Sequence, residues 1–364
     1  MSNTTTANNL TPFSCTYTAQ LPELLLKLNC SLAISTYQAG KLIFISPKDE
    51  NYLVQLPRTF DKPMGFCLND NKDKLALACR DQVIVFKAND ELAKHYPKSP
   101  NTYDTMFLPR LTYHTGALDI HDLHFGENDS LFAVNTLFSC LVKLDSDFNF
   151  VPVWKPKHIT ELVSEDRCHL NGMALQNGKP KYASAFGLGN THQSWRDTVT
   201  TGGVIFDVES NEVIAGGLPM PHSPKIYNNE LYVLLSATGE LAKINLSTGK
   251  YDVVTRIEGF VRGMSLHSEY LFIATSKLRK NSSTFAKLAF AEKANKCTIT
   301  AVHLPSGSIA GSLTYTNSVD EIYDIQVIPN KIRPNILNTL TNDHKGALSI
   351  PGATYWAAIN NQNE

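Results

Sequence analysis

Histidines, carboxylates and one arginine recur at equivalent places in six short phrases along the chain. Imidazole, carboxylate, guanidinium and phenol groups that meet in one place can hold a metal ion, bind an anion or transfer protons. The recurrence therefore predicts a polar site to which several repeats contribute. The central pairs of the six phrases are Met64-Gly65, His121-Asp122, Leu170-Asn171, His222-Ser223, Arg262-Gly263 and Tyr323-Asp324.

Three histidines, His121, His169 and His222, are the candidate ligands of a divalent transition metal. Neutral imidazole is a common metal ligand. Three histidines that leave coordination positions open suit a Lewis-acid hydrolase, lyase or isomerase, or an iron-dependent oxygenase. A structural alternative stays open for His121, as a strand-end ring that hydrogen-bonds a neighbouring loop. It also stays open for His222, as part of a rigid corner between prolines.

Four further residues are candidate catalytic groups. Arg262 is expected to hold a carboxylate, phosphate or sulfate group in bidentate fashion, whereas Tyr323, Asp122 and Glu321 are expected to transfer protons. Two structural alternatives remain. Arg262 could instead form an ion pair with Glu321 or Asp324 of the next repeat, and a buried aspartate could hydrogen-bond the backbone between repeats.

Three residues are candidate substrate-binding groups. Asn171 lies two positions after His169, so both side chains could face one side of a strand, where the amide would orient a substrate; the alternative is a turn cap. Trp195 and Arg196 lie in a loop at 187–203 that is glycine-rich at both ends. They could stack on and hydrogen-bond a sugar or an acidic ligand, or the tryptophan could simply pack on the rim.

Short β-type runs cut by polar turns dominate the chain. Runs rich in Val, Ile, Tyr and Phe and bounded by Gly, Asn or Asp are typical of strands and hairpins. A parallel α/β fold would need a helix between most strands, but helical periodicity occurs only in Leu21–Leu28 and Phe285–Lys293. The sequence therefore predicts an all-β fold, with strands in 31–46, 74–87, 130–145, 230–245, 270–276 and 298–304.

The spacing of the phrases indicates the kind of all-β fold. Equivalent positions lie about 52 residues apart, close to the ~40–50 residues of a four-stranded propeller blade. Six phrases predict a six-bladed β-propeller, with five or seven blades as alternatives. The strands in 31–46 have no opening phrase, and the last phrase, 321–329, has no strands after it. The two ends of the chain are therefore expected to complete one blade and close the ring.

The expected domain organisation follows from this ring. An N-terminal extension, 1–29, precedes a single propeller, 30–334, and a tail at 335–364 lies on the surface. Insertions at 88–120 and 187–202 are expected to project as loops.

Several phrases resemble a bacterial family of conserved proteins of unknown function. They are STYQAGKL at 35–42, CHLNGMAL at 168–175, LPMPHSPKIYNNELYVLLSATGEL at 218–241, GFVRGMSLH at 259–267 and EIYDIQVIP at 321–329. The resemblance covers about residues 30–335 and implies a propeller-like repeat fold, but it implies no activity. The Trp-Asp dipeptide that marks WD40 propellers is missing from the sequence.

The charge balance argues against polyanionic partners. Lys and Arg number 33 and Asp and Glu 34, a formal charge of −1, which gives no electrostatic reason to expect nucleic acid or an anionic membrane. No apolar stretch approaches the about eighteen residues of a membrane helix, and the N-terminus lacks the basic and apolar segments of a secretory signal. Seven cysteines without a C-x-x-C pair indicate free thiols. We therefore expect a soluble, cytoplasmic protein.

These observations predict a metal-dependent enzyme, a hydrolase, lyase, isomerase or oxygenase, that acts on a small polar or anionic substrate in the central channel. One alternative is a non-catalytic propeller that binds an anionic glycan, peptide or protein partner. Another is a structural repeat protein whose polar channel residues only satisfy one another.

Overall fold

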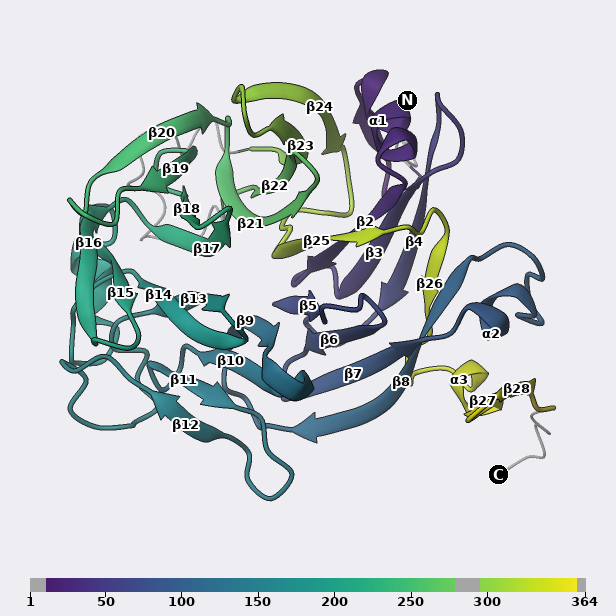
Figure 1. Ribbon diagram of the computed structural model, residues 1–364, viewed down its shortest axis with the longest axis horizontal. Helices are drawn as coiled ribbons and strands as arrows, with labels where there is room; N and C mark the ends of the chain where they lie inside the picture. Colours follow the sequence, from purple (N-terminus) through teal and green to yellow (C-terminus); the bar gives the residue numbers. More distant parts are fainter. Residues whose placement is uncertain (1–10, 279–294, 359–364) are drawn as a thin grey trace, which may run out of the picture.

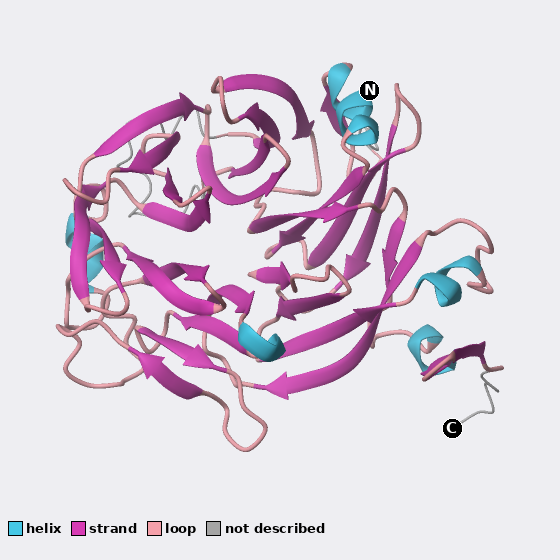
Figure 2. Cartoon of the chain, in the orientation of Figure 1, coloured by secondary structure: helices cyan, strands magenta, loops and turns pink. Residues whose placement is uncertain are grey.

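Six β-sheets of the described residues stand around a central axis as the blades of a propeller (Figure 1). The computed structural model describes residues 11–278 and 295–358. Strands dominate this part of the chain, and the three α-helices of the described residues lie outside the ring of blades (Figures 1 and 2). The predicted six-bladed, all-β fold is confirmed.

Each blade is an antiparallel sheet whose first strand lies innermost. Blade 1 contains β25 (Asp324–Pro329), β2 (Cys30–Thr36), β3 (Lys41–Pro47) and β4 (Leu53–Thr59). Blade 2 contains β5 (Phe66–Leu68), β6 (Lys74–Ala78), β7 (Gln82–Ala88) and β8 (Thr105–His114). Blade 3 contains β9 (Ile120–Phe125), β10 (Leu131–Asn135), β11 (Cys140–Lys143) and β12 (Val151–Trp154).

The other three blades repeat this pattern. Blade 4 contains β13 (Leu170–Gln176), β14 (Lys179–Ala185), β15 (Gly203–Asp207) and β16 (Glu212–Leu218). Blade 5 contains β17 (Pro221–Tyr227), β18 (Glu230–Leu235), β19 (Glu240–Ile244) and β20 (Tyr251–Arg256). Blade 6 contains β21 (Phe260–His267), β22 (Tyr270–Ser276), β23 (Cys297–His303) and β24 (Ser308–Tyr315).

Both ends of the chain build blade 1, as the sequence predicts. The C-terminal strand β25 pairs antiparallel with the N-terminal strand β2, with Val327 opposite Leu32. This pairing ties residues near the two ends of the chain into one sheet and leaves the ring without a gap between its first and last blades.

The middle strands are buried on both faces because each blade packs between two neighbours, so they read as nearly continuous apolar runs. Every residue of β2 is buried, whereas the outer strand β12 has no fully buried residue. A separate apolar cluster fills each of the six blade interfaces. Representative members are Phe44 and Phe86 between blades 1 and 2, Val85 and Leu123 between blades 2 and 3, and Met173 and Val134 between blades 3 and 4.

The N-terminal segment packs against the ring. Strand β1 (Cys15–Tyr17) pairs with β24 as a fifth strand of blade 6, with Cys15 opposite Tyr315. Helix α1 (Gln20–Lys27) confirms the helix predicted at Leu21–Leu28, and Leu21 and Leu25 anchor it in the cluster between blades 6 and 1. The second predicted helix, Phe285–Lys293, lies outside the described residues.

The segment 88–120 differs from the loop predicted there. It contains the short helix α2 (Asp90–Lys94) and the ten-residue β8, the last antiparallel strand of blade 2. Pro109 weakens the strand signal in the sequence, but an outer strand tolerates proline. The insertion at 187–202 does connect two strands as predicted, and it contains the 3-10 helix η2 (Ser194–Thr198). A second 3-10 segment, η1 (Glu127–Asp129), follows β9.

The C-terminal tail lies beside blade 2, outside the ring (Figure 1). Strand β26 (Pro334–Ile336) pairs in parallel with β8. Helix α3 (Asp343–Gly346) leads into a hairpin of β27 (Ala347–Ile350) and β28 (Ala353–Trp356). Trp356 attaches this hairpin to α2, because its indole N–H donates to the carbonyl of Leu92 and its ring packs 5.3 Å from that of Tyr96.

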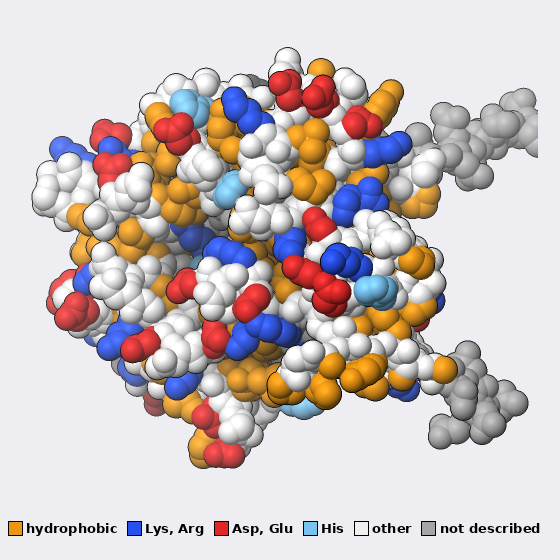
Figure 3. All heavy atoms as spheres, turned by 45° about the vertical axis from the view of Figure 1, so that its right-hand side comes forward, with side chains coloured by type: hydrophobic (Ala, Val, Ile, Leu, Met, Phe, Trp, Pro, Cys, Tyr) orange, Lys and Arg blue, Asp and Glu red, His pale blue; other side chains and the backbone are white. Residues whose placement is uncertain are grey.

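All seven cysteines are free thiols, as the sequence indicates. Within 11–278 and 295–358, no helix is long and apolar enough to cross a membrane. Acidic and basic side chains are interspersed on the face shown in Figure 3. This surface accords with the even charge balance of the sequence.

Replacing Gly263 by alanine is expected to lower the free energy of unfolding by about 3 kcal/mol. Gly263 has φ +75°, and a Cβ there would lie 2.8 Å from the Cα of Asp324 in the next blade, so strain and a backbone clash combine. The matched control is Gly116→Ala, with φ +74° and no atom within 4 Å of the new Cβ; we expect it to cost about 1 kcal/mol. Urea denaturation of both variants measures the difference, and equal losses would contradict the close approach of blades 6 and 1.

Candidate functional site

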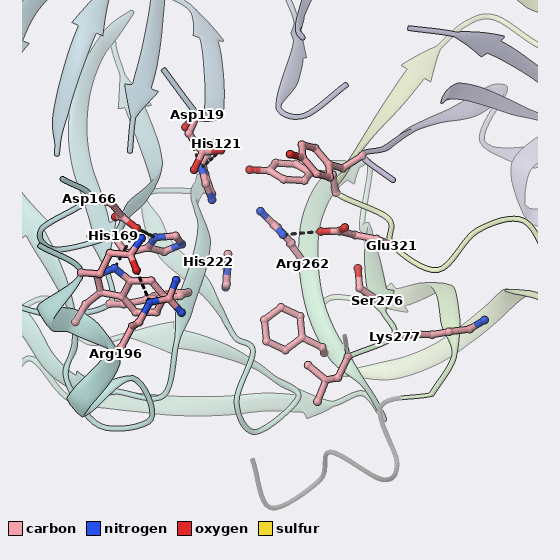
Figure 4. A pocket seen from close by; sticks show the side chains of 17 residues that line it. Asp119, His121, Asp166, His169, Arg196, His222, Arg262, Ser276, Lys277 and Glu321 are labelled. Carbon is pink, nitrogen blue, oxygen red and sulfur yellow. Dashed lines mark hydrogen bonds and ion pairs between the residues drawn. The ribbon is translucent and has the colours of Figure 1, made fainter. Parts of the chain in front are cut away.

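A cavity of about 340 Å³ opens at one mouth of the channel. Its size lies at the lower end of the range for small-molecule sites, roughly 300–1,000 Å³. Eight of the ten site residues predicted from the sequence line it, and Figure 4 shows several of their side chains around one space. These eight are His121, His169, His222, Arg262, Glu321, Tyr323, Trp195 and Arg196.

The blade architecture explains why these residues meet. The innermost strands converge on the channel, and His121, His222 and Arg262 lie at the starts of β9, β17 and β21. His169 and Tyr323 immediately precede β13 and β25. Residues far apart in the sequence therefore form one ring of side chains, while the loop of blade 4 adds Trp195 and Arg196 from the side.

The His121 ring is fixed through its Nδ1 atom. The Thr136 hydroxyl donates its one proton to the carbonyl of Leu170, at 2.5 Å, and lies 2.8 Å from His121 Nδ1. Because this hydroxyl can only accept from the imidazole, Nδ1 must carry the proton. The carbonyl of Asp119, 3.0 Å away, accepts from the same N–H.

His222 repeats this arrangement two blades further on. The Ser236 hydroxyl donates to the carbonyl of Val261, at 2.6 Å, and accepts from His222 Nδ1, also at 2.6 Å. The carbonyl of Met220 lies 3.2 Å from the same nitrogen. His222 therefore has the same tautomer as His121.

His169 is held by a carboxylate instead of a hydroxyl. Its Nδ1 lies 3.0 Å from the Asp166 carboxylate, which also accepts from the indole N–H of Trp195 at 3.1 Å. The Trp195 ring packs 4.4 Å from the His169 ring. Asp166 thus connects the blade 4 loop to the histidine and orients both rings.

Two of the three histidines, His121 and His222, present lone pairs to the cavity. With Nδ1 bound to the wall, the Nε2 edge of each ring is left for the cavity that the ring lines (Figure 4). Burial, and to a smaller extent His169 and Arg262, lower the pKa of His121 to about 4, against an opposing effect of Asp119. Burial, followed by Arg262, lowers the pKa of His222 well below its ordinary value. Both rings are therefore neutral acceptors at physiological pH.

This burial predicts a pH-dependent contribution to stability. A histidine whose pKa is lower in the folded state binds fewer protons there, so its stabilising contribution is present above the unfolded pKa and is lost as pH falls through the folded pKa. For His121, a pKa lowered from 6.5 to about 4 corresponds to about 3 kcal/mol lost between pH 6.5 and pH 4.

We therefore expect the stability difference between wild type and His121→Gln to shrink over this pH range. His95, an exposed histidine on the protein surface, supplies the control substitution His95→Gln, which removes no buried ring. Urea denaturation at several pH values measures both, and a flat difference for His121→Gln would contradict a buried neutral ring.

Arg262 and Glu321 form a buried ion pair. Arg262 Nη1 lies 3.1 Å from Glu321 Oε1, and both side chains are mostly buried. The guanidinium also lies 3.6 Å above the ring of Tyr323, a cation–π contact. Arg262 therefore forms the ion pair with Glu321 of the next blade that the sequence offered as its structural alternative. This ion pair holds the guanidinium against the cavity wall.

The phenol of Tyr323 is buried and keeps its proton at physiological pH. Burial raises the pKa of its phenol well above the ordinary value. No atom of the described chain hydrogen-bonds its hydroxyl, although that oxygen is buried. Its ring lies 5.6 Å from that of His121. A buried phenol without a partner is unusual in folded proteins and fits a hydroxyl kept for a ligand or an ordered water.

Two predicted site residues do not line the cavity. The Asp122 carboxylate accepts the backbone N–H groups of Leu123 and of Met173 in the next blade, so the structural alternative for a buried aspartate applies. The amide of Asn171 accepts from Ser184 at 2.7 Å and donates to the carbonyl of His169, and it does not face the cavity. Asp122 directly follows His121, and adjacent strand residues point apart. Asn171 lies two positions after His169, but His169 has a positive φ and the register shifts between Leu170 and Gly172, so these two side chains do not share a face.

Several lining residues escaped the sequence analysis. Asp166 lies three positions before His169, a spacing that could have suggested the pair. Phe260 lies two positions before Arg262, on the same side of a strand. Phe186 and Leu278 carried no comparable signal, since only the fold brings them to the cavity.

The predicted metal site is not preformed. Among the described residues, no three His, Cys, Asp or Glu side chains are grouped closely enough to hold a metal ion. The rings of His121 and His169 meet edge to face, 4.9 Å apart. Phe186 packs against both His169, at 4.5 Å, and His222, at 5.0 Å. A bound metal would require these rings to move, so a transition-metal cofactor stays a prediction.

Comparison with known proteins places this arrangement in a family. The sequence matches a domain of unknown function, DUF4915, over residues 19–337. The chain belongs to this family. The DUF4915 match runs from α1 to the end of β26 and therefore includes all six blades, while the hairpin β27–β28 lies beyond it. The predicted membership in a propeller family of unknown function is confirmed.

Solved structures support the fold alone. A chain of a nidogen/laminin complex superposes with a TM-score of 0.52 over 83% of this chain and 99% of its own length, at 10% identity. Likeness at this identity says nothing about the DUF4915 cavity. Among curated protein sequences, none matches the chain.

Proposed function

We propose that this propeller is an enzyme that binds a small organic anion in the cavity and transfers protons to or from it. One observation carries the proposal. The buried guanidinium of Arg262 lines the same cavity as His121 and His222, whose Nδ1 atoms carry the proton and whose Nε2 atoms are left as acceptors, and as His169, whose Nδ1 is bound to Asp166.

Arg262 supplies the anion-binding element. Glu321 takes one edge of the guanidinium, at Nη1, and Tyr323 covers one face. Within the described residues, no other hydrogen bond of this guanidinium is present, so further N–H groups can bind a carboxylate. Burial strengthens such a bond because water competes less.

The histidines supply the proton acceptors. The charge of Arg262 contributes to the low pKa of both His121 and His222. A bound carboxylate would offset that charge and raise the pKa of these imidazoles toward the ordinary range. The rings would then be better bases with substrate bound than without it, which suits general-base catalysis at a neighbouring O–H or C–H group.

A second candidate is the metal-dependent form of the same enzyme. Its support is the set of three Nδ1 partners, Thr136, Asp166 and Ser236, because metal-binding histidines commonly donate their other N–H to such groups. A hydrolase, lyase, isomerase or oxygenase mechanism would follow from the metal bound. The bacterial origin and the cytoplasmic location of the protein also stay predictions.

The decisive experiment measures turnover and metal together. Purified protein, with and without added Zn²⁺, Mn²⁺ or Fe²⁺, is incubated with a panel of organic acids, and mass spectrometry follows their conversion. We expect conversion by wild type and its loss in His222→Gln. One equivalent of metal, lost in the His121→Ala/His222→Ala variant, would favour the metal-dependent form. Binding without conversion would identify a non-catalytic module, and neither binding nor conversion would overturn the proposal.

A further inference from the structure

The cavity has an apolar wall beside its charged groups. Phe186, Trp195 and Phe260 belong to one buried apolar cluster, against which Leu278 packs, and all four residues line the cavity. The His222 ring contacts Phe186 and Phe260 edge to face, at 5.0 and 5.7 Å, so this wall adjoins the polar groups directly. A ligand that touches both can bury an apolar group while its polar end is hydrogen-bonded.

The polar side of the cavity requires a ligand that carries a hydrogen-bond donor as well as an anionic group. Arg262 offers N–H groups, which a carboxylate satisfies. The Nε2 atoms of His121 and His222 are acceptors, because Nδ1 carries the proton in both rings. An oxygen lone pair placed against these Nε2 atoms would be left without a hydrogen bond, whereas an O–H or N–H group would be satisfied.

The charge balance of the lining argues against a polyanion. Among the lining residues that the structure describes, three cationic side chains, Arg196, Arg262 and Lys277, accompany three carboxylates, Asp119, Asp166 and Glu321. Phosphate-rich ligands need an excess of positive charge. A singly charged acid, or an acid that also carries an ammonium group, suits an evenly balanced lining.

We infer that the substrate is a carboxylic acid with an O–H or N–H donor near the carboxylate and an apolar substituent. This inference rests on the proposed function and specifies its substrate class. The carboxylate of the ligand binds Arg262, and its O–H or N–H group donates to Nε2 of His121 or His222. Its apolar group packs against Phe186 and Phe260. The ligand thus contacts the cationic group, the acceptor nitrogens and the apolar surface of the cavity.

A set of matched probes tests each feature separately. Calorimetric titration compares 3-phenyllactate with three analogues that each lack one group: 3-phenylpropionate has no hydroxyl, lactate no ring and 3-phenylpropane-1,2-diol no carboxylate. We expect about tenfold weaker binding without the hydroxyl. Without the ring or the carboxylate, we expect about 100-fold weaker binding. Phenylalanine, tested alongside, shows whether an ammonium group serves as the donor better than a hydroxyl.

A variant locates the apolar group on the predicted wall. Phe260→Ala should weaken 3-phenyllactate about tenfold or more and leave lactate unchanged. The matched control is Phe148→Ala, at a phenylalanine that is 68% exposed on the surface, and it should change neither affinity. This difference between probes separates a direct contact from a general loss of structure, which would weaken both.

The outcomes separate this inference from the proposed function. Lactate or another small hydrophilic acid that binds as tightly as 3-phenyllactate would overturn the substrate class but keep the anion site. Tight binding of 3-phenylpropionate would overturn the requirement for a donor. Failure of every acid to bind would overturn both the class and the proposed function.

Discussion

Replacement of Arg262 by methionine is expected to abolish most anion binding and to destabilise the propeller. The guanidinium is the buried cation that we assign to the carboxylate, and losing a charge-assisted hydrogen bond of this kind weakens binding about 100-fold. Glu321 would also lose its buried ion pair with Arg262. Breaking one side of a buried ion pair costs about 3–5 kcal/mol of unfolding free energy.

The two effects can be separated by removing the partner charge as well. In Arg262→Met/Glu321→Leu neither charge remains, so most of the stability should return, while affinity for 3-phenyllactate should stay low. Arg256→Met is the matched control, because Arg256 also pairs with a glutamate, Glu240, but is 74% exposed. It should cost about 1 kcal/mol or less and leave binding intact.

Thermal and urea denaturation give the stabilities, and calorimetric titration gives the affinities. An Arg262→Met protein that still binds 3-phenyllactate with wild-type affinity would show that Arg262 serves only the ion pair. That result would remove the observation on which the proposed function depends.

The architecture was predictable because its signals are local and repeated. Turn residues between two β-type runs indicate each hairpin, as Thr238-Gly239 does between β18 and β19. The spacing of the phrases then sets the number of blades. Ring closure followed because the incomplete blades at the two ends complement each other, as β25 and β2 confirm. By contrast, β8 was missed because proline within a run argues against a central strand, although an outer strand tolerates it.

The orientation of individual site residues was less predictable. Simple alternation assigns side chains to faces only if a strand is regular. The inner strands are irregular near the cavity: the register shifts between Leu170 and Gly172 in β13 and between Val261 and Met264 in β21. Asp119 and His169 also have positive φ values. Such local geometry depends on contacts between blades, which one sequence does not display.

Asp122 has a structural role in place of the predicted catalytic one, because its carboxylate binds backbone N–H groups. Asp122, Ser223 and Asp324 occupy equivalent positions in blades 3, 5 and 1, and each accepts an N–H group from the inner strand of the following blade. The three aspartate or serine side chains therefore act as clamps between blades at every second interface. The donors are the backbone N–H groups of Met173, Gly263 and Phe66.

The Asp122 carboxylate is fully ionised at neutral pH, whereas the Asp324 carboxylate is partly protonated there. Burial alone would raise the pKa of Asp122, but Lys225, at 3.6 Å, and His124, at 3.2 Å, hold that pKa well below its ordinary range. Burial raises the pKa of Asp324 to about 7, with only a partial offset from Lys225. Asp122 is thus the counter-charge of a buried lysine.

Asp122→Asn is therefore expected to lower the free energy of unfolding by about 3–5 kcal/mol, because it removes the carboxylate that pairs with the mostly buried side chain of Lys225. It also removes one acceptor from a site that receives two backbone N–H groups. Binding of 3-phenyllactate to the folded protein should be unchanged, since Asp122 does not line the cavity. Urea denaturation and calorimetric titration at low temperature measure the two quantities.

Two comparisons decide what an Asp122→Asn result means. Adding Lys225→Met removes the unpaired charge and should recover much of the lost stability. Asp61→Asn breaks an ion pair with Arg80 in which both side chains are more than half exposed, and it should cost less than about 1 kcal/mol. If instead Asp122→Asn were as stable as wild type but inactive, the carboxylate would act in chemistry from outside the cavity lining. The explanation that Asp122 only neutralises Lys225 and joins two blades would then be wrong. The distinction between structural and catalytic carboxylates in this channel would fail with it.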